Sequence, residues 1–138
     1  MKGDKIKYSK GYKYFLREDY IINLPVFPKE VIQCEFFSLS TKGELRIYRR
    51  YAWDGASGPT IDTKSTMRGA LVHDVGYQAI RLGLLPVWYR EVFDKLLHDI
   101  CREDGMAWFR ADLWWKTVEV FGASAAEPRS EPKIYTAP

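Results

Sequence analysis

Short apolar runs with the two-residue period of β-strands fill the first half of the chain. Residues 12–22 are rich in aromatic and β-branched side chains, which favour an extended strand. Two further runs, 31–40 and 44–53, flank the turn-forming segment 41–43 and together predict a β-hairpin. Prolines mark a loop between the first strand and this hairpin. We therefore expect an antiparallel β-section in the first half of the chain.

The second half has apolar residues at helical spacing, and its glycines and prolines fall where helices begin and end. Ser65 or Thr66 can cap the first helix, and Pro86 opens the second. The apolar stripe of the third helix consists of Trp108, Ala111, Trp115 and Val118. The predicted helices cover residues 65–82, 86–104 and 106–121, and they end at Gly83, Gly105 and Gly122.

These elements predict an α+β fold in a single domain, in which N-terminal antiparallel strands with a hairpin precede three α-helices. The chain has 138 residues, which is enough for one domain with a core of its own. Residues 1–122 form the predicted domain. Residues 123–138 contain three prolines and few apolar side chains, so this C-terminal tail should be disordered on its own.

The charge and composition of the chain argue against nucleic-acid binding. The formal net charge is +3, from 21 basic and 18 acidic residues. The densest basic cluster, Arg46, Arg49 and Arg50, is small, whereas a nucleic-acid-binding domain presents a clustered basic face. Aromatic residues make up 15% of the chain, an excess that fits either a core or an adhesive surface. The sequence leaves those two alternatives open.

The cysteines, the N-terminal residues and the length of the apolar runs indicate the compartment in which the protein is made. Cys34 and Cys101 lack the spacing of a metal site and lie in apolar patterns, so we expect buried free thiols. Residues 1–10 are polar and basic, without the apolar segment of a signal peptide. No apolar run approaches the roughly 18 residues of a membrane span. We expect no transmembrane segment and synthesis in a cytoplasm.

A histidine and an aspartate stand side by side, as His73 and Asp74, in the otherwise apolar first helix. His73 and Tyr77 are four residues apart and share one face of that helix. Because the first two helices are joined by a short turn, they should pack antiparallel, and His73 can then face Asp94. A carboxylate that holds one ring nitrogen of His73 would leave the other nitrogen free as a base. The predicted catalytic residues are therefore His73, Asp94 and Tyr77.

Structural readings of the same residues remain open. An inward His–Asp pair is often only a satisfied buried polar contact, so for His73 with Asp94 a structural role and a catalytic role are about equally favoured. The second pair, His98 and Asp99, has the pattern of an exposed helix edge, so we expect it to be structural. A two-histidine metal centre of the phosphohydrolase type would need more ligands than the chain's 2 histidines allow.

A polar loop without periodicity, residues 51–63, joins the β-section to the helices. Such a loop can expose backbone carbonyls and amides beside its carboxylates. Asp74 should point toward this loop, where a hard cation such as calcium could be held by oxygen ligands. The predicted binding-loop residues are Trp53, Asp54, Gly55, Ala56, Ser57 and Gly58.

Four ordered segments together carry a family resemblance: YAWDGASGPTID, LVHDVGYQAIR, FDKLLHDICREDGM and RADLWWKTVEVFGASAAEP. They resemble a family of small proteins of unknown function that is common in tailed bacteriophages and prophages. The resemblance covers about residues 40–127. It implies synthesis in the cytoplasm of a bacterial host, with incorporation in the virion as one outcome, and other phage proteins as partners. The family itself implies no activity.

The order of the site residues is also similar to that of compact phospholipases A2 of the parvoviral type. A glycine-containing loop precedes His73 by about 20 residues, and Asp94 follows on an antiparallel helix. The resemblance implies that His73 activates a water molecule and that Asp94 orients the histidine. It further implies that Asp74 binds calcium together with loop carbonyls, and that Tyr77 and Tyr51 support the site.

Two functions follow as expectations. The first is a phage-associated His–Asp hydrolase of a lipid or other ester, assisted by calcium. The second is a non-catalytic virion or accessory protein that docks on other phage proteins, or on itself, through its aromatic surface and C-terminal tail. A third reading, a small inhibitor of host defence, rests on the phage setting alone.

Overall fold

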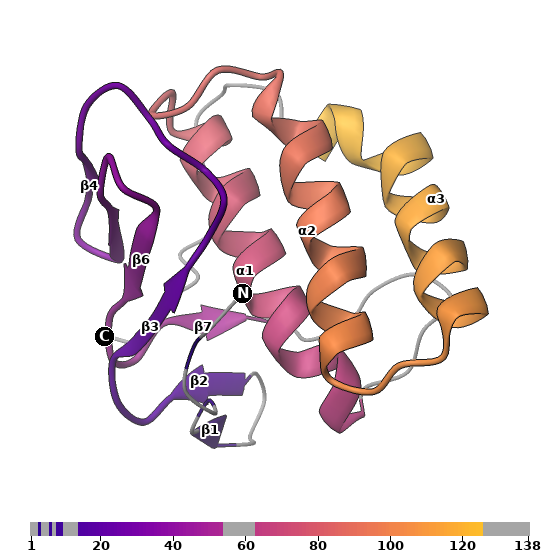
Figure 1. Ribbon diagram of the computed structural model, residues 1–138. Coiled ribbons are helices and arrows are strands. Elements are labelled where there is room, and N and C mark those ends of the chain that lie inside the picture. Colours follow the sequence, from indigo (N-terminus) through magenta and orange to yellow (C-terminus); the bar gives the residue numbers. More distant parts are fainter. Residues whose placement is uncertain (1–2, 4–5, 7, 10–13, 54–62, 126–138) are drawn as a thin grey trace. The chain divides into compact units, whose positions relative to one another are not determined.

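The computed structural model describes residues 3, 6, 8–9, 14–53 and 63–125 (Figure 1). The chain divides into two compact units, a β unit that contains the described residues up to Trp53 and a helical unit that contains residues 63–125. The predicted α+β class is confirmed, because antiparallel strands in two small sheets precede three helices.

The larger sheet of the β unit has four antiparallel strands in the order β3-β6-β5-β4. The pairing of β3 with β6 aligns Ile22 with Leu45 and Tyr20 with Ile47, all of which are buried. This alternation of buried and less buried residues is what a sheet with one covered face requires. The strands are β3 (Tyr20–Asn23), β4 (Ile32–Gln33), β5 (Phe37–Leu39) and β6 (Glu44–Ile47).

The smaller sheet has three antiparallel strands in the order β1-β2-β7, and its middle strand is anchored by buried Leu16. The strand β2 pairs Tyr14 with Trp53, and the two rings lie 5.8 Å apart. Trp53 is the predicted binding-loop residue that lies within the described part of the chain. Its side chain is fully buried in the core. The strands are β1 (Tyr8–Ser9), β2 (Tyr14–Leu16) and β7 (Ala52–Trp53).

Both arms of the predicted hairpin are interrupted, so their predicted extents are wrong. In the first arm the chain turns between Cys34 and Phe37, where the Cys34 amide donates to the Phe37 carbonyl at 3.0 Å. In the second arm a turn closed by the Tyr51 amide and the Tyr48 carbonyl, 3.1 Å apart, separates β6 from β7. Arg50 in that turn has a positive φ of 76°, which ends the alternating pattern.

The predicted strand over 12–22 is likewise two strands, with a bend at residues 17–19 between β2 and β3. Asp19 stabilises this bend from its side chain. One carboxylate oxygen accepts a hydrogen bond from the Arg49 amide at 2.8 Å, and the other accepts one from Arg46 at 3.1 Å. The predicted loop between β3 and β4, which contains the prolines, is confirmed.

The three helices of the helical unit are α1 (Lys64–Arg81), α2 (Tyr89–Glu103) and α3 (Trp108–Ala125). Thr63, rather than Ser65 or Thr66, is the N-cap of α1, and its amide donates to the Thr66 hydroxyl at 2.9 Å. The first two predicted glycine stops are confirmed, since Gly83 and Gly105 follow their helices with positive φ.

The predictions for the other helix ends need correction. The helix α2 begins three residues later than predicted, because residues 86–88 form the preceding turn. The helix α3 passes through Gly122 to Ala125, so Gly122 is not a stop. Its predicted stripe is also shifted: Trp108 is 65% exposed, whereas Trp114 is buried. The rest of the predicted tail, residues 126–138, lies outside the described residues.

Two glycines allow α1 and α2 to approach each other closely. A β-carbon added at Gly69 would lie 2.7 Å from the Cys101 sulfur and 3.2 Å from the Leu97 carbonyl oxygen. At Gly76 the added atom would lie 2.2 Å from the Phe93 ring. The same helix α2 packs on its other side against α3 (Figure 1).

Both cysteines are free, as predicted, with Cys101 buried and Cys34 half-buried. Within the described part of the chain, none of the helices combines the length and the apolar character that crossing a membrane requires.

Candidate functional site

The close packing of α1 on α2 brings His73 against Asp94. The Nε2 atom of His73 lies 2.7 Å from Oδ1 of Asp94, a hydrogen-bond distance. The side chain of Asp94 is completely buried, and that of His73 keeps 13% of its surface exposed. The predicted contact is therefore confirmed, and the histidine is not sealed from solvent. Its catalytic role stays a prediction.

Tyr77 is the second partner of the buried carboxylate. Its hydroxyl donates to the same Asp94 oxygen at 2.6 Å, and its ring lies 4.2 Å from the imidazole of His73. Burial, reinforced by the Asp94 carboxylate, raises the pKa of Tyr77 far above its ordinary value. Tyr77 is therefore a neutral donor at every physiological pH and cannot act as a base.

Arg90 is the third partner, and the sequence did not predict its full role. An arginine and an aspartate four residues apart on a helix usually form a solvated contact worth a few tenths of a kcal/mol. The Nη1 atom of Arg90 instead lies 3.5 Å from the buried Oδ2 atom of Asp94 and donates to the Glu119 carbonyl at 3.2 Å. Arg90 thus links the carboxylate to α3. No sequence signal marks the Glu119 carbonyl, because any residue could supply it.

The geometry assigns different tasks to the two ring nitrogens of His73. Ionised Asp94 accepts hydrogen bonds only, so Nε2 must carry the proton that is shared with it. In the neutral ring, Nδ1 then carries the lone pair. Among the described residues, nothing is hydrogen-bonded to Nδ1. A histidine held in this way can take a proton from a molecule that reaches Nδ1.

The remaining predicted site residues belong to the polar loop and to its neighbourhood. Asp54, Gly55, Ala56, Ser57 and Gly58 lie outside the described residues. Asp74 is half-buried on α1, and Tyr51 is fully buried in the β unit. The described ranges contain no group of three or more His, Cys, Asp or Glu side chains arranged to hold a metal ion.

The second His–Asp pair lies elsewhere on α2 and is not the exposed edge that the sequence predicted. His98 has only 15% of its side chain exposed, and its Nε2 atom lies 2.8 Å from Asp112 of α3. Its Nδ1 atom lies 2.9 Å from Asp99. Burial alone would raise the pKa of Asp99, but hydrogen bonds from Lys95 and His98 outweigh it and lower that pKa. Both ring nitrogens of His98 are occupied, and its contact with Asp112 joins α2 to α3.

No protein-family model matches the chain, and neither a curated protein nor a solved structure was found to be significantly similar to it. The resemblances to the phage family and to phospholipases A2 thus remain expectations. The geometry on which a function can be proposed lies in the helical unit. There the buried carboxylate of Asp94 holds Nε2 of His73, and Nδ1 of the same ring is not hydrogen-bonded to any described residue.

Proposed function

We propose that the protein hydrolyses ester bonds, with His73 as the general base that activates water. The supporting observation is the 2.7 Å contact between Nε2 of His73 and buried Asp94, which directs the lone pair of the neutral ring to Nδ1. Tyr77 and Arg90 hold the carboxylate in place through its two oxygens. A carboxylate that both orients the ring and stabilises its charged form is the arrangement that general-base catalysis needs.

The proposed reaction has two proton transfers. Nδ1 of His73 takes a proton from water as the water oxygen attacks the ester carbonyl, and Asp94 stabilises the resulting imidazolium. The tetrahedral intermediate then breaks its bond to the leaving oxygen. The imidazolium returns the proton to that oxygen, so a carboxylic acid and an alcohol are released. The acid then ionises in water.

The proposed substrate is a lipid or another ester, as the order of the site residues suggests. Calcium is the proposed cofactor, with Asp74 as its carboxylate ligand and carbonyls of the 54–58 loop as the others. The bound ion would offset the negative charge that develops on the carbonyl oxygen. The proposed setting is a tailed phage or prophage.

The two His–Asp pairs provide a matched test. Purified wild-type, His73→Ala and His98→Ala proteins are assayed on phospholipid vesicles and on a soluble nitrophenyl ester, with calcium or with a chelator. We expect His73→Ala to lower the rate by at least about a hundredfold and His98→Ala to keep most of it. Equal rates in wild type and folded His73→Ala would refute the proposal, as would a wild type that is inactive on both substrates.

A second candidate function is supported by the surface of α3. Four large apolar side chains of this helix are more than half exposed: Trp108, Phe109, Leu113 and Val120. Such a surface favours the alternative of a non-catalytic protein that docks on phage proteins or on a second copy of itself. Replacement of Phe109 and Leu113 by serine should then abolish co-sedimentation with phage particles. Unchanged co-sedimentation would exclude α3 as the docking surface.

A further inference from the structure

The turn that joins α1 to α2, at the top of Figure 1, exposes apolar side chains. Residues 82–89 read LGLLPVWY and contain no charged side chain. Leu82, Val87 and Trp88 are exposed, and Trp88 keeps 63% of its surface accessible. Surface turns usually combine glycine or proline with polar side chains, so this composition calls for an explanation. We call Leu82, Val87 and Trp88 the apolar tip.

Backbone hydrogen bonds hold this turn in one conformation. The Leu84 amide donates to the Ala79 carbonyl at 2.9 Å. The Gly83 amide donates to the Ile80 carbonyl at 3.0 Å, and the two bonds together form the Schellman end of α1. The Tyr89 amide closes the second half of the turn with a bond of 3.1 Å to the carbonyl three residues earlier. Because the turn is already ordered, binding through it would cost little conformational entropy.

The same segment also contributes side chains to the core. Leu85 and Tyr89 are buried. The indole of Trp88 stacks on the ring of Tyr89, with centroids 3.9 Å apart and planes inclined by 22°. The segment is thus anchored by two inward side chains, while Trp88 is held at the surface by its neighbour.

We propose that the apolar tip inserts into the surface of a lipid bilayer. Three side chains on a turn expose far less than the roughly 800 Å² that each partner contributes to a stable protein–protein interface, which disfavours a second copy or another protein. A bilayer surface needs no matching shape. Leu82 and Val87 suit its hydrocarbon, and an indole such as that of Trp88 favours the boundary between hydrocarbon and water.

The polar groups of the turn are compatible with such an environment. Amides that enter lipid must be hydrogen-bonded within the protein. Most amides of this segment donate to nearby carbonyls, namely those of Leu82, Gly83, Leu84, Leu85, Tyr89 and Arg90. Pro86 has no amide. The segment contains no carboxylate that headgroup phosphates would repel. The proposal goes beyond the proposed hydrolysis, because it involves neither His73 nor Asp94.

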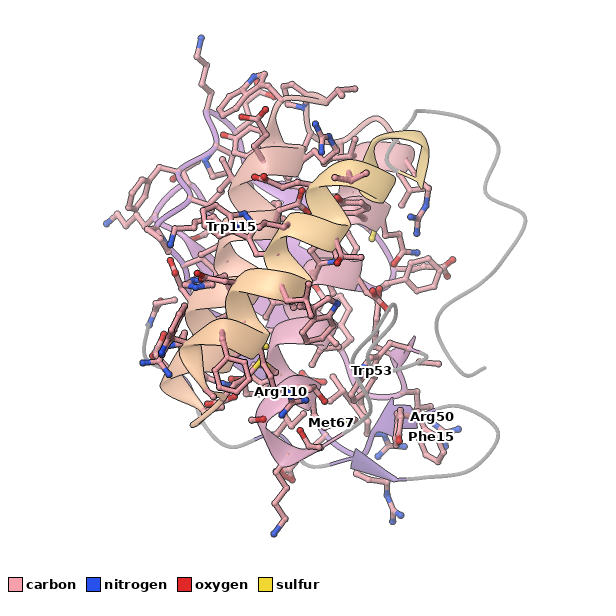
Figure 2. All side chains as sticks on the ribbon, turned by 90° about the vertical axis from the view of Figure 1, so that its right-hand side faces the viewer. Phe15, Arg50, Trp53, Met67, Arg110 and Trp115 are labelled. Atoms are coloured by element: carbon pink, nitrogen blue, oxygen red, sulfur yellow. The ribbon has the colours of Figure 1, made fainter. Side chains whose placement is uncertain are left out.

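Three variants of the full chain test the role of Trp88. Trp88→Ser removes the indole, and Trp88→Phe keeps an apolar ring. Trp108→Ser is the matched control, because Trp108 is 65% exposed on α3, the helix that carries Arg110 and Trp115 in Figure 2. Substitutions at exposed positions seldom unfold a protein, and circular dichroism checks that each variant is folded.

The probe is a vesicle of ether-linked phosphatidylcholine, which has no carboxylic ester that the proposed hydrolase could cleave. Co-sedimentation measures binding. We expect the wild type to bind, Trp88→Ser to bind about tenfold more weakly, and Trp88→Phe and Trp108→Ser to stay within about twofold of the wild type. Tryptophan emission should move to shorter wavelength when vesicles are added to the wild type, and less so in Trp88→Phe.

Binding that persists in about 0.5 M salt supports apolar insertion, because salt screens charge attraction. Binding that disappears at this salt concentration would overturn the proposal, as would equal weakening by Trp88→Ser and Trp108→Ser. A wild type that ignores vesicles would also overturn it, including the case in which ultracentrifugation shows that the tip joins two copies of the chain. Since the vesicles contain no cleavable ester, the result is independent of whether the protein hydrolyses esters.

Discussion

Asp94 is the residue on which the polar contacts of the helical unit converge. It is fully buried, and its oxygens meet His73, Tyr77 and Arg90 at 2.7, 2.6 and 3.5 Å. A buried carboxylate is costly unless its charge is matched and its oxygens are hydrogen-bonded, and these three partners provide both. The arrangement therefore serves stability as well as the proposed chemistry, and experiments must separate the two.

The substitution Asp94→Asn separates the contribution of this residue to stability from its proposed role in catalysis, because it changes a single side-chain atom. An amide at position 94 can donate to Nε2 of His73, which would move the ring proton to Nδ1 and remove the proposed base. We expect the rate of ester hydrolysis to fall by about 10²–10⁴ in a protein that remains folded. Asp99→Asn in the other His–Asp pair is the control. A folded Asp94→Asn protein with wild-type activity would contradict the proposed role.

Sequence reasoning reached part of this cluster and missed another part. His73, Tyr77 and Asp94 were predicted because helical spacing and a short interhelical turn place them on facing surfaces. The contact of Arg90 with the Glu119 carbonyl was missed because a backbone acceptor has no residue-specific signature. The position of Trp53 in the core was missed because glycine and aspartate beside it suggested a binding loop.

At the scale of elements, the close approach of α1 and α2 places the cluster. Gly76 contacts the ring of Phe93, the residue directly before Asp94, and Gly76 itself lies three residues after His73. A larger residue at this point would separate the helices where the His73–Asp94 contact forms. Glycine inside a helix is otherwise unfavourable, so the close packing accounts for its use here.

We expect Gly76→Ala to destabilise the protein by about 1–3 kcal/mol, although alanine is the better helix former. The added β-carbon would lie 2.2 Å from the Phe93 ring, so the helices must shift. Chemical denaturation measures the change. The double variant Gly76→Ala with Phe93→Leu should recover part of the loss through a favourable coupling. If the double variant lost as much stability as the two single variants together, the contact with the Phe93 ring would not be the cause of the destabilisation.

Strand boundaries were predicted less well than helices, for a physical reason. Helix ends are marked by residues such as Gly83 and Gly105, whose positive φ favours glycine. The turn between β6 and β7 uses Arg50 at a positive φ, so the usual signal of glycine or asparagine is absent. The two short strands were therefore read as one continuous arm.

At the scale of the whole molecule, the chain consists of a β unit and a helical unit. The α+β class followed from the change of hydrophobic period between the two halves of the chain. The four residues of the site, His73, Tyr77, Arg90 and Asp94, all belong to the helical unit.

The stability of the whole protein should depend on alkaline pH through Cys101. Burial raises the pKa of this thiol from 9.0 to about 12. Above pH 9 the thiol ionises in the unfolded chain but not in the folded one, so stability present below pH 9 is lost as pH rises toward 12. The loss is about 1.4 kcal/mol per pH unit. Urea denaturation between pH 8 and pH 10.5 should show a flatter pH dependence in Cys101→Ala than in wild type or Cys34→Ala. Identical slopes would contradict this account.

The central claim, that Asp94 holds Nε2 of His73 and leaves Nδ1 as the base, is tested most directly by nitrogen NMR of the imidazole ring. The chain has 2 histidines, so the variant His98→Gln leaves the ring of His73 as the single imidazole signal. We predict that the neutral ring carries its proton on Nε2 in this variant and on Nδ1 after the further change Asp94→Asn. A neutral ring protonated on Nδ1 while Asp94 is present would contradict the account.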